Sequence, residues 1–420
     1  MKPLKGRLQG AQTLPALPPL DWTLVLQQQL LPWFSHVRRD LPWRRRRDPY
    51  AVWVSEIMLQ QTQVNTVIPY FERFMTHFPS VEMLADAPLE QVLSLWKGLG
   101  YYARARNLHR GAQYVVQHHA GQFPEQLEAA LQVPGVGRYT AGAILSLAYE
   151  KPVSLLDGNV ARVYARLLRL PLDPKQPAGM KAFQFLADTQ VPTQEAGPFN
   201  EALMELGATV CTPLSPRCSG CPVQGLCQAA AAGEASLFPV KGTRKERPDV
   251  FGVALLVETP EGILVAQRPA EGLLGGLWEL PTLIRSPEES WEAAASRVAQ
   301  ERLGLMPVPL GAGVEVEHVF THLRLVLQVF PVRVDKEGIS SGHLLAPVSL
   351  SEARRRGTEA VEVRYQALRW VSREGLEQLP MGVATTRALG LLMKAPPPQL
   401  GLFGVPVVAE KKARKAHKSR

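Results

Sequence analysis

Glu56 is the first residue whose surroundings suggest chemistry. It is the only charged residue between positions 49 and 71, inside the apolar run Val52-Trp-Val-Ser-Glu-Ile-Met-Leu-Gln-Gln. A carboxylate on a largely apolar helix loses hydration, which raises its pKa, so Glu56 is expected to hold a proton near neutral pH. The competing interpretation is a glutamate at the water-facing edge of that helix.

Asp157 is the second candidate, in the run Leu155-Leu-Asp-Gly-Asn-Val, and it carries the only charge between Lys151 and Arg162. It precedes a predicted helix, so it is also a natural N-cap. Two carboxyl groups in differently polar surroundings are what glycosidic-bond cleavage requires. One protonates the leaving group, and the other stays ionised to stabilise the sugar cation.

A glycine-rich turn lies between two helical stretches, in the run Val133-Pro-Gly-Val-Gly-Arg-Tyr-Thr-Ala-Gly. Backbone N–H groups of Gly135, Val136 and Gly137 and of the next helix N-terminus can point at an anion, which predicts a phosphate cradle. A glycine hairpin that only turns the chain remains the alternative. If the glycosidic bond belongs to a base inside duplex DNA, that base must first be flipped out of the stack, and this requires a grip on the phosphates.

All four cysteines fall within 17 residues, at Cys211, Cys218, Cys221 and Cys227. Four thiolates in one loop can bind zinc or a 4Fe-4S cluster. Structural zinc sites usually offer two short cysteine pairs, whereas only one x2 pair exists here, which favours the cluster. Two disulfides are the remaining alternative, and they fit poorly with the lack of a secretory signal.

The composition is that of a soluble globular protein of 420 residues, with 47 Lys+Arg against 38 Asp+Glu and a formal net charge of +9. No run of 18 apolar residues and no apolar signal core is present, so a membrane span and secretion are not expected. The positive charge lies in residues 1–250, with 26 basic and 20 acidic side chains, and in the last twenty, with six and one. Such an excess suits an anionic partner or serves solubility equally well.

Helical periodicity dominates from position 21 to about 232. It predicts an all-α domain over 21–232, preceded by an extension at 1–20 that is expected to be disordered. Helices are predicted at 21–39, 49–64, 101–119, 140–149 and 160–170. The polar, charged segment 233–249 is predicted to be an interdomain linker.

Short β-rich runs at 251–258, 262–267 and 323–334 follow, with one helical stretch at 287–303. This pattern is typical of a compact α+β domain, predicted over 250–394. Residues 395–420 begin with a proline run and end in a lysine- and arginine-rich stretch. This tail is expected to be disordered, with contact to DNA or plain solvation both open.

Taken together, these motifs resemble the adenine DNA glycosylases of the MutY type, in the helix-hairpin-helix superfamily that includes endonuclease III. The matching runs are Leu41-Pro-Trp, Trp53-Val-Ser-Glu-Ile-Met-Leu-Gln-Gln-Thr-Gln-Val, Trp96-Lys-Gly-Leu-Gly-Tyr-Tyr-Ala-Arg-Ala-Arg-Asn-Leu, Pro134-Gly-Val-Gly, Leu156-Asp-Gly-Asn-Val-Ala-Arg-Val and the four cysteines. The resemblance spans roughly residues 25–395. It implies excision of adenine mispaired with 8-oxoguanine or guanine in double-stranded DNA.

The resemblance also implies roles for individual residues. Glu56 matches the general acid that protonates adenine at N7, Asp157 the carboxylate that stabilises the oxocarbenium ion, and Asn159 its hydrogen-bonding support. Tyr139 and Arg44 match positions that line the adenine pocket and active site. Gln61 and Tyr101 match residues that probe or intercalate beside the lesion pair. For Tyr101 and Trp53 an ordinary core role competes.

Tyr139 distinguishes this chain within the superfamily. Relatives that also nick the strand carry a Schiff-base lysine at this position. The resemblance therefore implies a monofunctional glycosylase.

The second half resembles a Nudix fold through Gly262-Ile-Leu-Val-Ala-Gln-Arg-Pro and Gly275-Gly-Leu-Trp-Glu-Leu-Pro. A Nudix hydrolase needs a glutamate-rich helix for magnesium. The stretch Arg297-Val-Ala-Gln-Glu-Arg keeps one of three such glutamates, so hydrolysis of nucleotide diphosphates is not expected. The resemblance implies an 8-oxoguanine-reading module with Phe320, Thr321 and His322 as its loop; His318 and His322 as ordinary strand-edge residues are the alternative.

The predicted architecture is thus an all-α helix-hairpin-helix domain with a 4Fe-4S loop, followed by a Nudix-like α/β domain. The DNA grip is expected from residues 44–47, Arg104, Arg106, the hairpin amides and the cysteine loop with Arg217. The expected protein is a cytoplasmic, nucleoid-associated monomer, with repair or replication proteins as possible partners. A thymine-mismatch or oxidised-pyrimidine glycosylase and a non-catalytic damage sensor are the competing hypotheses, and a sensor has no need of Glu56.

Overall fold

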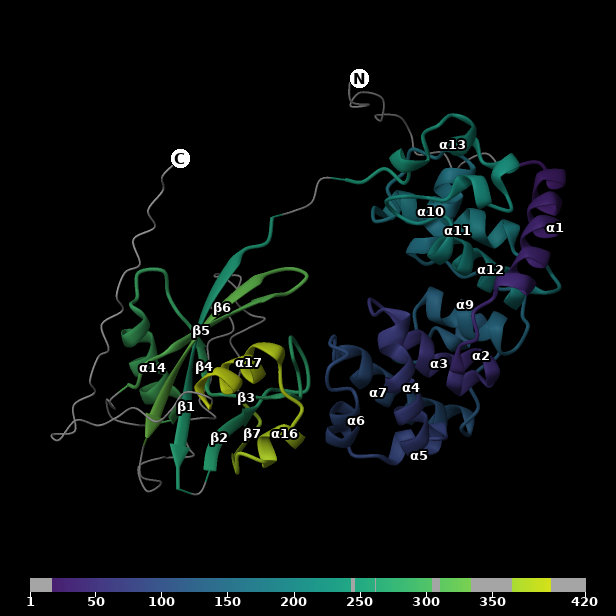
Figure 1. Ribbon diagram of the computed structural model, residues 1–420. Helices are drawn as coiled ribbons and strands as arrows, with labels where there is room; N and C mark the ends of the chain where they lie inside the picture. The colour runs from purple at the N-terminus through teal and green to yellow at the C-terminus, as the bar shows by residue number, and fades with distance from the viewer. Residues whose placement is uncertain (1–16, 243–245, 261, 304–309, 334–364, 394–420) are drawn as a thin grey trace, which may run out of the picture. The chain divides into compact units, whose positions relative to one another are not determined.

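The computed structural model describes residues 17–242, 246–260, 262–303, 310–333 and 365–393 (Figure 1). The chain divides into two compact units, Met1–Glu246 and Arg247–Arg420, and each is described by itself. The predictions of disorder fall on residues 1–20 and 395–420. Apart from positions 17–20, these lie outside the described residues.

The described part of the first unit consists of helices. They are α1 (Leu20–Val37), α2 (Pro42–Arg45), α3 (Pro49–Leu59), α4 (Val64–His77), α5 (Val81–Asp86), α6 (Leu89–Leu95), α7 (Ala103–His119), α8 (Leu127–Ala130), α9 (Arg138–Leu147), α10 (Gly158–Leu167), α11 (Pro177–Gln190), α12 (Ala196–Thr209) and α13 (Gln228–Ala231), with short 3₁₀ turns η1 (Cys218–Gly220), η2 (Gln224–Leu226) and η3 (Ala235–Leu237). Figure 1 shows α2 to α7 gathered in one group and α1 with α10 to α13 in another, with α9 between them.

The predicted helix 49–64 ends five residues early, at Leu59, and α4 begins only at Val64. Asp48 caps α3, accepting a hydrogen bond from the Ala51 N–H at 2.8 Å, and α3 ends at Leu59. Gln61 then adopts a left-handed backbone conformation with φ of 57°, and a right-handed helix cannot continue through such a residue. The other four helices predicted in this unit differ from the observed ones by no more than three residues at either end.

Close packing of α10 against α12 positions part of the later site. The two helices share an apolar core with α1 and α11, built from side chains such as Leu30, Tyr164, Phe183 and Leu203. A Cβ on Gly207 of α12 would lie only 2.6 Å from the Cβ of Asn159. Glycine is therefore needed where α12 crosses the start of α10.

The second unit is a mixed sheet between two helices. Its described strands are β1 (Asp249–Thr259), β2 (Gly262–Gln267), β3 (Trp278–Glu279), β4 (Thr282–Ile284), β5 (Val314–Val319), β6 (Arg324–Arg333) and β7 (Ala367–Val371), in the order β3-β2-β1-β6-β5, with β4 paired to β1 and β7 to β2. Only the β1–β6 pairing is parallel among the described strand pairs.

Both faces of this sheet are buried. Val253, Leu255 and Val257 of β1 pack with α14 (Trp291–Leu303), and their alternating neighbours face the core that α17 (Val383–Leu392) covers, with the short α16 (Gly375–Gln378) beside it. Such a sheet covered on both faces explains why β1 is apolar throughout instead of alternating. The predicted fold classes of both halves are confirmed, and none of the described helices is long and apolar enough to span a bilayer.

Candidate active site

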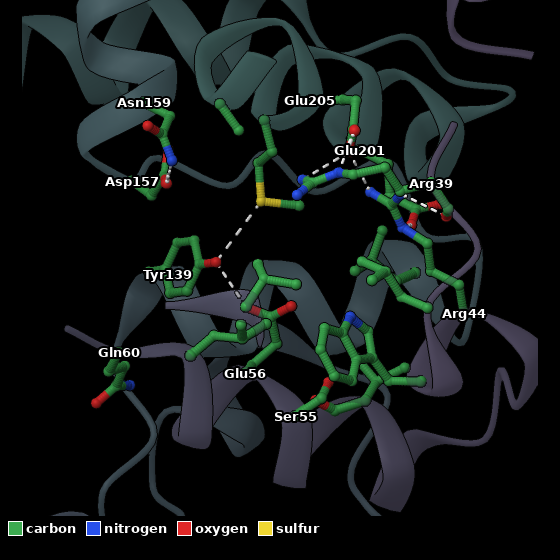
Figure 2. A pocket seen from close by; sticks show the side chains of 18 of the residues that line it. Arg39, Arg44, Ser55, Glu56, Gln60, Tyr139, Asp157, Asn159, Glu201 and Glu205 are labelled. Carbon is green, nitrogen blue, oxygen red and sulfur yellow. Dashed lines mark hydrogen bonds and ion pairs between the residues drawn. The ribbon is translucent and has the colours of Figure 1, made fainter. Parts of the chain in front are cut away.

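A cavity of about 570 Å³ opens in the first unit where the two groups of helices meet (Figure 2). It is lined by α2, α3, both ends of α9, the N-terminus of α10 and one face of α12. The chemically active residues in its wall are Arg39, Arg44, Arg47, Glu56, Gln60, Gln61, Tyr139, Asp157, Asn159, Met204, Glu201 and Glu205. Every first-unit residue that the sequence predicted for catalysis therefore lies at this cavity.

Glu56 projects into the cavity from a helix that is buried almost all round. Residues 51–58 of α3 are all buried, and the Glu56 side chain is 4% exposed. Burial raises the pKa of Glu56 to about 7, while a hydrogen bond from Tyr139 partly opposes the rise. The predicted effect of desolvation is confirmed, and the water-facing alternative is wrong.

Tyr139 holds the Glu56 carboxyl from the first turn of α9. Its hydroxyl donates to Glu56 Oε2 at 2.6 Å and also lies 3.6 Å from the sulfur of Met204. Burial and the neighbouring carboxylates raise the pKa of Tyr139 well above its ordinary value, so it remains a hydrogen-bond donor. Figure 2 shows Tyr139 between Glu56 and Asp157.

Asp157 faces the cavity from the other group of helices. It is the N-cap of α10 and accepts from the Val160 N–H at 2.7 Å, so the capping interpretation is correct as well. Asn159 Nδ2 donates to its second oxygen at 2.8 Å. Burial raises the pKa of Asp157, and these hydrogen bonds act in the opposite direction by stabilising the carboxylate.

Arg162 extends this arrangement toward the cysteine loop. Its Nη2 donates to Asn159 Oδ1 at 2.8 Å and to the Gly207 carbonyl at 2.7 Å, while its Nε donates to the Cys211 carbonyl at 2.8 Å. The orientation of Asn159, and through it of Asp157, is thereby tied to the loop that begins at Cys211.

Two further acids in the cavity wall were missed from the sequence. Glu201 and Glu205, one turn apart on α12, are 6% and 1% exposed. They form ion pairs with Arg44 at 2.8 and 2.9 Å, and Glu205 also pairs with Arg39 at 2.5 Å. The signal that found Glu56 applies here too, because these are the only charged residues in α12.

The phosphate grip predicted for residues 44–47 needs correction at Arg44, while contact of the exposed Arg45, Arg46 and Arg47 with DNA stays a prediction. Arg44 lines the cavity as predicted, but its guanidinium is buried and committed to Glu201 and Glu205. Arg45 pairs with Asp40, and Arg46 lies 3.7 Å from the carboxylate of Asp48, both at the surface. Arg44 therefore serves the interior of the site and not the DNA backbone.

Arg104 and Arg106 were also predicted to contact DNA, and that prediction is wrong. Both are buried, at 8% and 7% exposure. The guanidinium of Arg104 is surrounded by carbonyl groups of the protein itself. Closely spaced arginines on a helix predict a basic surface when only the sequence is considered, but these two side chains are buried.

The hairpin connects α8 to α9. Gly135 has φ of +80° and a Cβ there would lie 2.5 Å from the Cβ of Asn107, so only glycine fits. The Val136 N–H donates to the Val133 carbonyl at 3.0 Å. The prediction that this amide points at an anion is therefore wrong, and Gly137 is the N-cap of α9.

Gln61 and Tyr101 are both exposed, on loops whose backbone is left-handed at these residues, with φ of 57° and 49°. Gln61 lies at the mouth of the cavity. Tyr101 is 48% exposed, so the core interpretation is wrong for it. That interpretation is right for Trp53, which is 1% exposed and packs edge-on against Phe123.

The four cysteines line one small apolar pocket beside α10 and the end of α12. Burial, and after it the other three cysteines, raise the pKa of the Cys221 thiol to about 11. Four thiolates can share this pocket only if a cation compensates their charge. Arg166, 1% exposed, donates to Cys211 Sγ at 3.2 Å and to the Thr212 carbonyl at 2.8 Å.

This pocket fits an iron-sulfur cluster, because its lining brings together the four cysteine thiols that a 4Fe-4S cluster requires as ligands. Bound there, the cluster would cross-link the loop 211–227 and so brace the end of α12 and Arg162. Arg217, predicted to reach phosphate, donates to the Thr209 carbonyl.

The second unit places Phe320, Thr321 and His322 in the turn between β5 and β6. The Phe320 N–H donates to the Leu323 carbonyl at 2.8 Å, and the Phe320 ring packs edge-on against His318 at 4.5 Å between centroids. Thr321 and His322 are exposed. In α14, two of the three expected Nudix glutamate positions hold buried Val298 and Arg302.

Comparison with known proteins agrees with this architecture. Residues 54–186 match the HhH-GPD superfamily of base excision DNA repair proteins, 211–227 the iron-sulfur binding domain of endonuclease III, and 252–391 the NUDIX domain. The adenine DNA glycosylase of Mus musculus is 39% identical over 371 residues, covering 76% of this chain and 72% of the mouse protein. That of Schizosaccharomyces pombe is 32% identical over 373 residues, covering 72% and 80%. A solved thermostable thymine-DNA glycosylase is 30% identical, with a TM-score of 0.47, over 50% of this chain and 98% of that one.

The helical unit, its hairpin, its cysteine loop and its acid-lined cavity define a base excision DNA repair glycosylase that carries a 4Fe-4S cluster. Such enzymes act on DNA and hydrolyse N-glycosyl bonds. Within that class, the chain belongs to the adenine DNA glycosylase family.

The buried state of Glu56 has a measurable cost. Between pH 4.5 and 7 the carboxyl ionises in the unfolded chain but stays protonated in the fold, so the free energy of unfolding falls as pH rises through this window. Above pH 7 the loss reaches about 3 kcal/mol. Glu56→Gln cannot ionise, so its unfolding free energy relative to the unsubstituted protein should grow by this amount between pH 4 and pH 8.

Denaturant unfolding at the two pH values measures this difference. Glu72→Gln, at an exposed position of α4, is the matched control and reports the effect of the same substitution at the surface. A difference for Glu56→Gln that does not change with pH would show that the carboxyl is already ionised in the fold.

Proposed function

We propose that this enzyme removes adenine mispaired with 8-oxoguanine or guanine from duplex DNA, with Glu56 as the general acid. The observation that carries the proposal is a carboxyl with a pKa of about 7, buried in a cavity and held by Tyr139, with a second carboxylate across the cavity. A general acid works best when its pKa lies near the working pH.

In the proposed reaction, Glu56 gives its proton to N7 of the extruded adenine. The bond between C1′ and N9 then breaks, and its electron pair stays on the base, which leaves as neutral adenine after proton redistribution. Asp157, supported by Asn159, stabilises the positive charge that develops on the sugar. Water adds to C1′ and releases a proton, leaving an abasic site.

Adenine selection is supported by the polar groups beside Glu56. Adenine offers a donor at its amino group and acceptors at its ring nitrogens. The Arg44 and Glu201 pair presents both a cation and a carboxylate in the cavity wall, at 8% side-chain exposure each. A thymine has a different order of donors and acceptors, so it is the natural test of this pocket.

The duplex is proposed to be gripped by the amides of Gly135, Gly137 and the first turn of α9, since a helix N-terminus attracts phosphate. Gln61 and Tyr101 are proposed to enter the base stack beside the lesion pair. Their exposure, and in the case of Gln61 its place at the cavity mouth, support this role.

The second unit is proposed to read the 8-oxoguanine opposite the adenine through Phe320, Thr321 and His322. An exposed hydroxyl and an exposed imidazole follow a half-buried aromatic ring there, which suits stacking and hydrogen bonding to one base.

The enzyme is proposed to cut no DNA strand. A coupled lyase needs a lysine amine to form a Schiff base with C1′, and Tyr139 occupies the position that the lysine takes in lyase-active relatives. Its hydroxyl is instead engaged by Glu56.

A base-release assay tests the function directly. Duplexes carrying A opposite 8-oxoguanine, A opposite G, and T opposite G are incubated with enzyme in excess, and abasic product is revealed by alkali. We expect adenine to be released from the first two duplexes and no thymine from the third. Release of thymine would favour the thymine-mismatch hypothesis, and tight binding without any release would favour a damage sensor.

A second prediction concerns the recognition unit. Deleting residues 250–420 should leave adenine excision in place but reduce the preference for 8-oxoguanine over guanine by roughly 5- to 150-fold, because one stacked, hydrogen-bonded base is worth about 1–3 kcal/mol. The ratio of single-turnover rates on the two duplexes measures it. Phe320→Ala in the full chain should lower the ratio in the same direction, and an unchanged ratio in both variants would refute the assignment.

A further inference from the structure

Arg104 of α7 joins two loops that lie far apart in the sequence. Its Nη1 donates to the carbonyls of Ile57, Met58 and Gln60 at 2.8, 2.8 and 2.6 Å. Its Nη2 donates to Thr62 Oγ1 at 3.2 Å and to the carbonyls of Leu99 and Gly100 at 3.2 and 3.1 Å. One guanidinium therefore binds both the α3–α4 loop and the α6–α7 loop.

Each of these loops carries one of the two exposed residues proposed to probe the duplex. Gln61 lies between two Arg104 acceptors, Gln60 and Thr62, and Tyr101 directly follows the acceptor Gly100. Both residues hold a left-handed backbone, which costs free energy for any residue other than glycine. Such conformations persist only when surrounding contacts hold them.

The shape of the guanidinium suits this task. The carbonyls at the end of α3 have lost their helical partners and carry partial negative charge, so a cation binds them favourably. The aromatic rings of Trp96 and Tyr101 lie 5.4 and 5.6 Å from the guanidinium carbon. Burial lowers the pKa of Arg104 to about 10, which leaves it charged at neutral pH. A lysine ammonium is a point donor and cannot reach two loops at once.

We propose that Arg104 is a positioning residue that fixes the Gln61 loop and the Tyr101 loop relative to each other, so that both side chains enter the duplex at one base pair. This rests on the proposed function, in which those two residues probe the lesion pair. It also replaces the role that the sequence suggested for Arg104, since a buried guanidinium bonded to six protein oxygens does not contact phosphate.

The test is Arg104→Lys in the full-length, cluster-containing enzyme. Misplacing the two loops should lower the single-turnover rate on A opposite 8-oxoguanine roughly 100-fold, as expected for a displacement of about 1 Å. A 2-aminopurine at the target position, whose fluorescence rises when it leaves the stack, should show a matching loss of base extrusion. Arg106→Lys, a buried arginine on the same helix, is the matched control and should leave extrusion unchanged.

A mutant cycle separates positioning from general destabilisation. The double variant Gln61→Ala, Tyr101→Ala already lacks both probing side chains. If Arg104 acts through the two loops, adding Arg104→Lys to this double variant should lower its rate by less than about threefold. The proposal would be overturned if the triple variant lost activity by the product of the fold-losses of Arg104→Lys and of the double variant. Normal base extrusion by Arg104→Lys would also overturn it. Thr62→Val, which removes one acceptor, should lower extrusion in the same direction, so the proposal can be tested even if Arg104→Lys fails to fold; unchanged extrusion in that variant would count against it.

The unsubstituted enzyme separates this proposal from the proposed function. If it releases no adenine from any duplex, the proposed function fails. If it releases adenine and Arg104→Lys does so equally well, only the role of Arg104 fails.

Discussion

The site depends on keeping the Glu56 carboxyl out of water without giving it a cation of its own. Eight consecutive buried residues of α3 remove solvent from it, and its close partner is the neutral hydroxyl of Tyr139. Arg44 lies in the same cavity and lowers the pKa of Glu56, but burial outweighs this effect, and the guanidinium is bound to Glu201 and Glu205. The carboxyl therefore titrates near neutral pH, where a proton is both held and available for transfer.

This arrangement explains why both groups of helices are needed. The acid and its tyrosine come from α3 and α9, while Asp157 and the acids that occupy Arg44 come from α10 and α12. Asp157 is held by Asn159, which Arg162 links to the backbone of Cys211. The cysteine loop therefore supports one wall of the cavity, and the cluster acts at a distance from the base through the fold.

Much of this could be predicted from the sequence, because isolated charges in apolar runs report burial directly. Glu56 was found in that way, and the same signal in α12 would have found Glu201 and Glu205. The cysteine loop was found from the clustering of all four cysteines within 17 residues. Charge alone could not show where arginines point. Arg44, Arg104 and Arg106 looked like a phosphate grip, but tertiary packing buries all three. Arg44 there binds carboxylates, and Arg104 binds carbonyls. The hydrogen bond that occupies the Val136 amide also depends on the exact turn, which glycine content does not specify.

The pH dependence of excision tests the role of Glu56 most directly. The apparent second-order rate constant on A opposite 8-oxoguanine should fall tenfold per pH unit above about 7, as the acid of the free enzyme loses its proton. The hydrogen bond from Tyr139 lowers the pKa of Glu56, so Tyr139→Phe should move this fall to higher pH, whatever it does to the maximal rate. A profile with no fall above pH 7, or one that moves to lower pH in Tyr139→Phe, would contradict the assignment of Glu56 as the general acid.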